Sequence, residues 1–177
     1  MRVEDTNLAD CKILIPEVFA DERGFFLETY NKKKFDQLFG NITFKQDNHS
    51  RSDYAVLRGL HYQKKNPQGK LVRVVSGEVF DVAVDIRPDS NTFGKWTSVI
   101  LSAENKKQFW IPPGFAHGFI VLSDYCDFEY KCTEYYDPSD EGSIIWNDTE
   151  IQIDWPISKP KVSRKDQSAK KLSEIYE

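Results

Sequence analysis

Apolar residues recur at every second position in several short segments, and this period constrains the fold more strongly than any other feature of the chain. Between residues 80 and 86, Phe80, Val82, Val84 and Ile86 share one face of an extended segment, and the residues between them share the other. Further short segments of this kind cover residues 71–75, 96–101, 119–122 and 128–133. Turns rich in Pro, Gly, Asp and Ser separate them. Many short strands at regular spacing predict a mainly β fold, an antiparallel sandwich or barrel of the jelly-roll type with a few short helices.

Three local predictions refine this picture. A turn around Gly77 is expected to join the strands on either side of it as a hairpin. A helix is expected after Asn31, which would cap it, and before Gly40, which would end it. The helix would bury Phe35, Leu38 and Phe39. A second short helix is expected from Ser163, with Asp166 three residues on as in a capping box.

The composition describes a folded domain without a strong electrostatic bias. The 177 residues are 40% hydrophobic and 14% aromatic, and the net charge of -4 gives no general attraction to nucleic acid or to an anionic membrane surface. No stretch approaches the roughly 18 apolar residues of a membrane helix, and the first residues lack the apolar region of a secretory signal. The three cysteines are odd in number and lack metal-type spacing, which favours a reduced, cytoplasmic protein. We therefore expect one domain, with neither nucleic acid nor membrane as a partner.

Polar residues within one apolar segment give the first indication of chemistry. His61 follows Arg58 in an Arg-Gly-Leu-His segment, and Lys70 comes nine residues after His61. An apolar segment has little structural use for two cations unless an anion lies there. A base beside a fixed positive charge suits removal of a proton next to a carbonyl, because the resulting enolate needs a cation nearby. Taken alone, His61 could equally be a structural histidine.

Two more residues have both a structural and a chemical interpretation. Tyr130 alternates with Phe128 and Cys132, so all three share a face that we expect to point inwards. Its hydroxyl would then be a packed core group or a general acid that faces the base across a pocket. Asp166 would either cap the last helix or reach His61, orient the ring and stabilise the imidazolium. Sequence spacing alone does not choose between these roles.

A third histidine lies in a motif with a known metal-binding counterpart. His117 ends the segment Pro-Pro-Gly-Phe-Ala-His, which is similar to the second motif of the cupin barrels, where this histidine often binds a metal. The first cupin motif normally supplies H-x-H and a downstream Glu, whereas here it offers His61 followed by Tyr and Gln. Two separate histidines make a poor metal site, so we expect no metal.

Seven motifs between about Phe19 and Asp166 together resemble the dTDP-4-dehydrorhamnose 3,5-epimerase family. They are DERGFFLE (21–28), QxNxS (46–50), RGLHYQ (58–63), QGKLVR (68–73), DVAVDIR (81–87), PxGxAHGF (112–119) and YKCT (130–133). Any one of them could arise by chance, but seven in this order are specific. The resemblance implies a cofactor-free cupin-type jelly roll that works as a homodimer, with residues 1–177 as a single cupin-like epimerase domain.

The resemblance also implies a role for each matching position. His61 matches the base, Asp166 its carboxylate partner, Tyr130 the acid on the opposite face and Lys70 the cation beside the C4 oxygen. The positions that match sugar-binding and diphosphate-binding residues are Arg23, Phe26, Glu28, Gln46, Asn48, Arg58, His117, Tyr136, Glu141 and Lys165. The implied reaction converts dTDP-4-dehydro-6-deoxyglucose to dTDP-4-dehydrorhamnose on the route to L-rhamnose.

Related activities remain open at this stage because they share these catalytic residues. They include epimerases that invert only C3 or only C5, and 3,5-epimerases of other 4-keto sugar nucleotides such as GDP-linked heptoses. A sugar 3,4-ketoisomerase is disfavoured because it lacks the Arg-Gly-Leu-His context. A non-catalytic sugar-binding cupin is disfavoured by the intact base, acid and cation, and a cupin oxygenase would need a metal.

Overall fold

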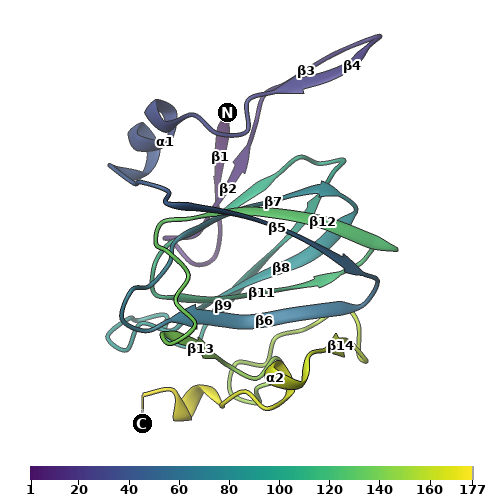
Figure 1. The fold of residues 1–177 in the computed structure, drawn as a ribbon. Coiled ribbons are helices and arrows are strands. Elements are labelled where there is room, and N and C mark those ends of the chain that lie inside the picture. The colour runs from purple at the N-terminus through teal and green to yellow at the C-terminus, as the bar shows by residue number, and fades with distance from the viewer. Residues whose placement is uncertain (177) are drawn as a thin grey trace.

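The computed structural model describes residues 1–176 and consists of two facing, mostly antiparallel β-sheets with few short helices (Figure 1). The strands are β1 (Arg2–Asp5), β2 (Lys12–Ile15), β3 (Val18–Asp21), β4 (Gly24–Leu27), β5 (Gln46–Asp53), β6 (Val56–Gln63), β7 (Lys70–Ser76), β8 (Glu78–Asp85), β9 (Trp96–Ser102), β10 (Gln108–Ile111), β11 (Phe115–Val121), β12 (Tyr125–Cys132), β13 (Glu141–Ser143) and β14 (Lys161–Val162). The helices are α1 (Lys32–Phe39), α2 (Arg164–Gln167) and the 3-10 helix η1 (Leu172–Glu174). The predicted fold class is confirmed. Glu177, the last residue of the predicted domain, lies outside the described residues.

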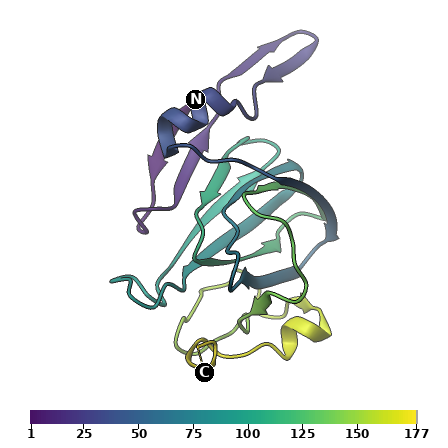
Figure 2. The same ribbon diagram turned by 60° about the vertical axis from the view of Figure 1, so that its left-hand side comes forward.

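The two sheets differ in strand order. The first sheet runs β1-β2-β10-β7-β12-β5, and the second runs β13-β6-β11-β8-β9, with β14 added in parallel beside β6. β3 and β4 form a separate hairpin that projects away from both sheets (Figure 2). Because neighbours in each sheet come from distant parts of the sequence, the space between the sheets is lined by residues far apart in the chain.

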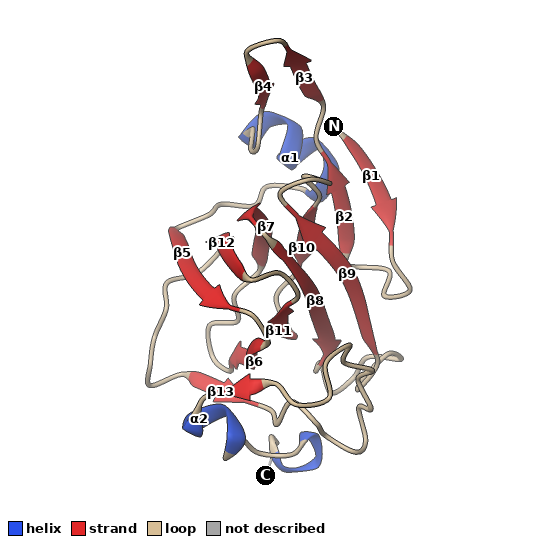
Figure 3. Cartoon of the chain, turned by 90° about the vertical axis from the view of Figure 1, so that its right-hand side faces the viewer, coloured by secondary structure: helices blue, strands red, loops and turns tan. Residues whose placement is uncertain are grey.

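The period-two pattern of β8 gives the second sheet two buried faces. Val79 and Ala83 point into the core between the sheets, whereas Val82 and Val84 belong to a second core on the opposite face. The chain after β13 covers that outer face, as Figure 3 shows for α2 and the C-terminal end. The second core is completed by Leu60, Tyr62, Ile86, Ala116, Ile144, Ile151, Leu172 and Ile175. The chain after β13 is therefore packed onto the outside of the second sheet.

The hairpin predicted around Gly77 is wrong. β7 and β8 follow one another in sequence but lie in different sheets. Gly77 has a φ of +82°, and a Cβ at this position would lie 2.1 Å from the carbonyl oxygen of Tyr125. The glycine makes a tight corner that carries the chain from one sheet to the other. As a result β7 and β8 form opposite walls of one interior.

The helix predictions are confirmed in position and differ in one buried residue. The side chain of Asn31 accepts a hydrogen bond from the Lys34 N–H at 3.2 Å and caps α1, and Gly40 follows its last residue. Phe35 is buried against Trp110 of the first sheet, with ring centroids 5.3 Å apart. Leu38 is 47% exposed, because the helix contacts the sheet along one side only. Within residues 1–176, no helix has the length and apolar character needed to cross a bilayer.

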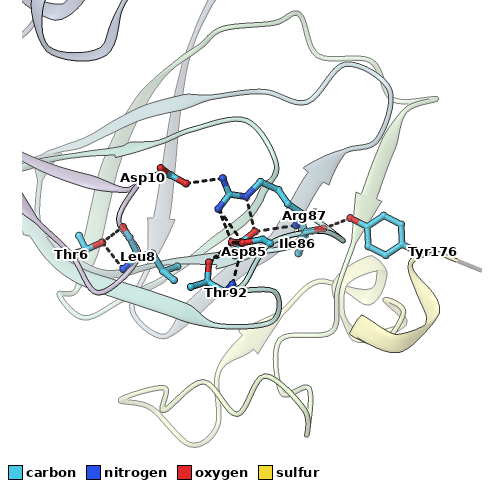
Figure 4. Close-up of polar contacts among 9 residues, drawn as sticks. Thr6, Leu8, Asp10, Asp85, Ile86, Arg87, Thr92 and Tyr176 are labelled. Carbon is cyan, nitrogen blue, oxygen red and sulfur yellow. Dashed lines mark hydrogen bonds and ion pairs between the residues drawn. The ribbon is translucent and has the colours of Figure 1, made fainter.

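A charged cluster holds the turn that follows β8 (Figure 4). Arg87 donates from Nε and Nη2 to the carboxylate of Asp85 at 2.9 and 2.7 Å, and from Nη1 to Asp10 at 2.7 Å. The hydroxyls of Ser90 and Thr92 each donate to Asp85 at 2.6 Å. Burial on its own raises the pKa of Asp85, but these donors hold it well below its ordinary value. The buried carboxylate is therefore tolerated because its partners are present.

Candidate active site

A cavity of about 260 Å³ lies between the two sheets where β7 begins. It is lined by Gln46, Asn48, His61, Tyr62, Gln63, Gln68, Lys70, Tyr130, Cys132, Tyr136 and Glu141. The structure thus brings His61, Lys70 and Tyr130 to one place from three different strands. The cavity lining runs from Gln46 to Glu141, so the pairing and facing of the two sheets bring residues far apart in the sequence together.

The candidate base stands on the second sheet. His61 projects from β6 with 33% of its side chain exposed, and its Nε2 lies 2.7 Å from Oδ1 of Asp166 on α2. Asp166 is 3% exposed. Burial on its own raises the pKa of Asp166, but the contact with His61 leaves it below the ordinary value of an aspartate. A carboxylate that stays ionised can fix the histidine tautomer and stabilise the imidazolium.

The structure separates the two interpretations of Asp166. Its backbone N–H donates to the Ser163 hydroxyl at 3.1 Å, so Ser163 caps α2 as predicted. The carboxylate does not complete a capping box and instead points to His61. The backbone of Gly59 also lowers the pKa of this carboxylate. The helix start therefore serves to aim the carboxylate at the histidine.

The candidate cation and acid stand on the opposite wall, in the first sheet. Lys70 opens β7, and β12 pairs with β7 so that Cys132 lies beside Lys70 and Tyr130 beside Val72. Lys70 is 7% exposed, and within the described residues its ammonium has no ion pair or hydrogen bond. Burial lowers the pKa of Lys70. An ammonium without a partner is available to a negative charge that develops in the cavity.

Tyr130 has the properties that a proton donor needs. It projects inwards from β12 towards the cavity with its neighbours Phe128 and Cys132 on the same face, as predicted from their alternation. Burial raises the pKa of Tyr130, which keeps the phenol protonated at neutral pH. Because Tyr130 belongs to the first sheet and His61 to the second, a ligand between the sheets would have the two groups on opposite sides.

A second histidine–carboxylate pair is buried next to the cavity. His117 Nε2 lies 3.0 Å from both carboxylate oxygens of Asp81, and the two side chains come from the neighbouring strands β11 and β8. Strand pairing also places His117 opposite His61. Burial raises the pKa of Asp81 and lowers that of His117, because each charged form is taken out of water. Within residues 1–176, no three His, Cys, Asp or Glu side chains are grouped as metal ligands.

A chain of hydrogen bonds fixes the amides on one wall. Gln46 Nε2 donates to Asn48 Oδ1 at 2.9 Å, and Asn48 Nδ2 donates to the Cys132 sulfur at 3.6 Å. The backbone N–H of Tyr136 donates to Gln46 Oε1 at 2.8 Å. Both amide oxygens are thus occupied, and each amide nitrogen keeps one hydrogen for a ligand.

At the rim of the cavity, a tyrosine and a lysine both contact the carboxylate of Glu141. The Tyr136 hydroxyl donates to Glu141 Oε2 at 2.8 Å, and the ammonium of Lys165 contacts the same oxygen. Lys165 neighbours Asp166 on α2. The rim is therefore joined to α2, the helix that carries Asp166.

Six of the ten residues implied in substrate binding are absent from the cavity lining, namely His117 and Lys165, described above, and four others. Arg58, also on β6, donates from Nε to Ser52 at 2.9 Å and is exposed. Arg23, Phe26 and Glu28 lie on or beside the projecting β3–β4 hairpin. Arg23 pairs with Asp21. Within one chain, the side chains of Arg23, Phe26 and Glu28 therefore do not line the cavity.

Several cavity residues were missed by sequence reasoning. Asp81, Gln63, Gln68 and Cys132 had no predicted role at the site, yet three of them line the cavity and Asp81 holds His117. The signal for Asp81 was a carboxylate at an inward position of an apolar strand. Gln63 donates to the Asn66 and Tyr135 carbonyls at 2.8 and 3.1 Å, which no short-range pattern encodes.

Comparison with known proteins agrees with this geometry. The model of the family described as dTDP-4-dehydrorhamnose 3,5-epimerase matches residues 5–174. The dTDP-4-dehydrorhamnose 3,5-epimerase of Salmonella typhimurium is 59% identical over 98% of this chain and 97% of its own length.

Two solved structures extend the comparison. A dTDP-6-deoxy-D-glucose-3,5-epimerase of Legionella pneumophila, in complex with dTDP-4-keto-L-rhamnose, is 55% identical with a TM-score of 0.96, covering 98% of this chain and 94% of that one. A dTDP-4-dehydrorhamnose 3,5-epimerase of Elizabethkingia anophelis is 51% identical with a TM-score of 0.94, covering 99% and 98%. These matches confirm the resemblance drawn from the seven motifs, and the chain belongs to the dTDP-4-dehydrorhamnose 3,5-epimerase family.

Proposed function

We infer that this chain is an isomerase that converts dTDP-4-dehydro-6-deoxyglucose to dTDP-4-dehydrorhamnose by epimerisation at C3 and C5. The main support for this inference is that the candidate base and the candidate acid stand on two facing sheets, on opposite sides of the cavity. His61 with its Asp166 partner stands on one sheet, and Tyr130 and Lys70 stand on the facing sheet. A base and an acid on opposite sides of a carbon acid are what inversion at that carbon requires.

The reaction follows from ordinary carbon-acid chemistry. The C4 ketone acidifies the hydrogens on C3 and C5. His61 takes the proton from one carbon, and the electron pair of the broken C–H bond moves into an enolate whose oxygen is stabilised by Lys70. Tyr130 donates its proton to the opposite face of the same carbon. His61 then releases its proton to solvent and Tyr130 regains one, after which the second carbon reacts in the same way.

The remaining polar groups are proposed to hold the sugar and the diphosphate. Gln46 and Asn48 present amide hydrogens to the cavity, and Arg58, which is outside the lining, would supply a guanidinium. A guanidinium suits a diphosphate because its fork matches two oxygens. Tyr136, Glu141 and Lys165 would close the rim over the sugar, with His117 positioned behind it.

Solvent isotope incorporation tests the number of inverted centres. In deuterated buffer, the product formed from dTDP-4-dehydro-6-deoxyglucose is expected to carry deuterium at both C3 and C5, because each new C–H bond takes its proton from an exchangeable group. Mass spectrometry and proton NMR give the count, and parallel incubations with UDP-linked and GDP-linked 4-keto sugars test the nucleotide. Incorporation at one carbon only would replace this proposal by a single-site epimerase, and no incorporation would favour a sugar-binding protein.

We further propose that the protein works as a homodimer whose subunits exchange their β3–β4 hairpins. Phe19, Phe25 and Phe26 of the hairpin are 57%, 61% and 69% exposed, which is a large apolar surface for an isolated chain. Arg23 on the same hairpin has an exposed guanidinium. A second copy would cover the aromatics, and its own Arg23, Phe26 and Glu28 would reach the cavity that lacks them.

Sedimentation velocity tests this proposal. The wild-type chain is expected to sediment as a dimer at micromolar concentration, and Phe26→Asp is expected to give a monomer with weaker dTDP binding. Ile100→Asp, which places the same charge at a 39% exposed apolar residue of β9, is the control and is expected to remain dimeric. A wild-type monomer would contradict the proposal.

We propose that residues 1–177 act as one epimerase domain in the cytoplasm. Cys11, Cys126 and Cys132 are all buried as free thiols, which is compatible with a reducing compartment. Burial raises the pKa of Cys126 to about 12, so this thiol is unreactive at neutral pH.

A further inference from the structure

The carboxylate that pairs with the base is carried by a segment fastened to the second sheet at both ends. Before α2, β14 pairs with β6, and the Lys161 N–H donates to the Ala55 carbonyl at 2.7 Å. After α2, Lys170 bridges to Ile144, and the Ile145 N–H donates to the Lys170 carbonyl at 2.8 Å. Asp166 lies between these two attachments. The position of its carboxylate is therefore set by how both are held.

The second attachment leads directly to the base. Ile144 and Leu60 exchange backbone hydrogen bonds at 2.9 and 3.2 Å, and Leu60 precedes His61. The backbone of Ile144 thus lies between the strand of the base and Lys170, four residues beyond Asp166. A shift of Lys170 relative to Ile144 would move Asp166 relative to His61.

A buried carboxylate outside the cavity holds this attachment. Asp148 is 4% exposed and accepts three backbone hydrogen bonds. Its Oδ1 accepts from the Glu150 and Ile151 N–H groups at 2.7 and 3.2 Å, and its Oδ2 accepts from the Leu172 N–H at 2.8 Å. One side chain therefore joins the turn after Ile144 to the chain just beyond Lys170. A buried carboxylate without these donors would be costly, so the bonds are a strong constraint.

Apolar packing extends the same attachment. Leu172 and Ile175 are buried in the outer core of the second sheet. The Tyr176 hydroxyl donates to the Ile86 carbonyl, at the turn held by Asp85 and Arg87 (Figure 4). Apolar contacts thus hold the chain beyond Asp166 against the sheet. The hydrogen bond from the Leu172 N–H to Asp148 fixes where along the sheet this segment lies.

We propose that Asp148 is a positioning residue that acts on the reaction through Asp166. It touches neither the cavity nor the base. It sets the lateral position of residues 170–172 and with it the 2.7 Å contact between Asp166 and His61. The inference rests on the catalytic role proposed above for Asp166.

The test is a double-mutant cycle on the full chain. Asp148→Asn cannot accept all three bonds, because one of its two terminal atoms becomes a donor. It is expected to lower kcat by about ten- to a hundredfold, the usual cost of a misplaced catalytic group, with the Kd for dTDP unchanged. In an Asp166→Asn background, the same change is expected to have no further effect on kcat. Asp154→Asn, on an exposed carboxylate of the same loop, is the control with the same loss of charge.

The outcomes separate this inference from the proposed function. A fully active Asp166→Asn enzyme would remove the role of Asp166 and with it this inference, but the proposed epimerisation would stand. An impaired Asp166→Asn enzyme beside a fully active Asp148→Asn enzyme would overturn the positioning role alone. Additive losses in the double variant would also overturn it, because a merely structural defect would add to the loss from Asp166→Asn. If Asp148→Asn does not fold, Tyr176→Phe, which loosens the same segment, takes its place in the cycle with the same expected non-additivity.

Discussion

Replacing His61 by Asn is expected to lower kcat by about a thousandfold or more, because the group that takes the proton from C3 and C5 is lost. Asn has a similar shape and can still donate to Asp166, so the buried carboxylate keeps a partner and the fold should persist. The dTDP affinity is expected to stay near the wild-type value, since His61 touches the sugar rather than the nucleotide in the proposed arrangement. Stopped assays in deuterated buffer would give the rate and the exchange together.

The matched variant for this experiment is Tyr130→Phe, which removes the proposed acid and leaves the base in place. His61→Asn should abolish both proton exchange and inversion. Tyr130→Phe should still exchange protons from the face of the base but invert poorly, because no group on the first sheet returns a proton. Substantial proton exchange in His61→Asn would contradict the assignment of His61 as the base. Full epimerisation by Tyr130→Phe would contradict the assignment of Tyr130 as the acid.

Replacing Lys70 by Met is expected to give opposite changes in activity and stability. The enolate would lose its cation, and kcat should fall by about a hundred- to a thousandfold, the cost typical of a lost oxyanion donor. The free energy of unfolding should rise, because a mostly buried lysine, whose ammonium has no ion pair and opens only to the cavity, is replaced by an apolar side chain of similar length. Thermal unfolding of wild type and variant, beside their kcat values, would show both changes.

The pH dependence of this effect follows from the direction of the pKa shift. Burial lowers the pKa of Lys70 in the folded chain below its value in the unfolded chain. The unfolded chain therefore holds this proton more tightly, so protonated Lys70 destabilises the fold at neutral pH. That penalty shrinks as the pH rises from the folded pKa towards the unfolded pKa, and the stability gain of Lys70→Met should shrink with it. A gain that stays constant up to pH 10, or a loss of stability at pH 7, would contradict the view of Lys70 as an unpaired buried cation.

The sequence predicted the strands and their faces well because alternation is a local property. Tyr130, Phe128 and Cys132 were placed on one inward face from spacing alone, and the structure agrees. The corner at Gly77 was misassigned for the same reason. Local turn chemistry indicates that the chain bends, but which sheet the next strand enters depends on partners such as β11 and β12, far away in sequence.

The site was predictable only in part. The motif around Arg58 and His61 and the cation Lys70 could be recognised as chemistry from their residue types. The contact between His61 and Asp166 spans 105 positions, and Ser163 gave Asp166 a sufficient local explanation as part of a helix start. The pair of Asp81 and His117 was missed because the sequence shows which residues share a face of β8, whereas burial of that face depends on the opposite sheet.

The attachment of Asp166 to the outside of the second sheet has a consequence for the order in which function is acquired during synthesis. The base strand β6 and its partners β11 and β8 all leave the ribosome before Asp166 does, and the strands of both sheets can pair without it. A nascent chain can therefore be folded in its sheets while its histidine still lacks a carboxylate. Competence for proton abstraction would then be gained only after the sheets have formed, when the segment that carries Asp166 packs onto them.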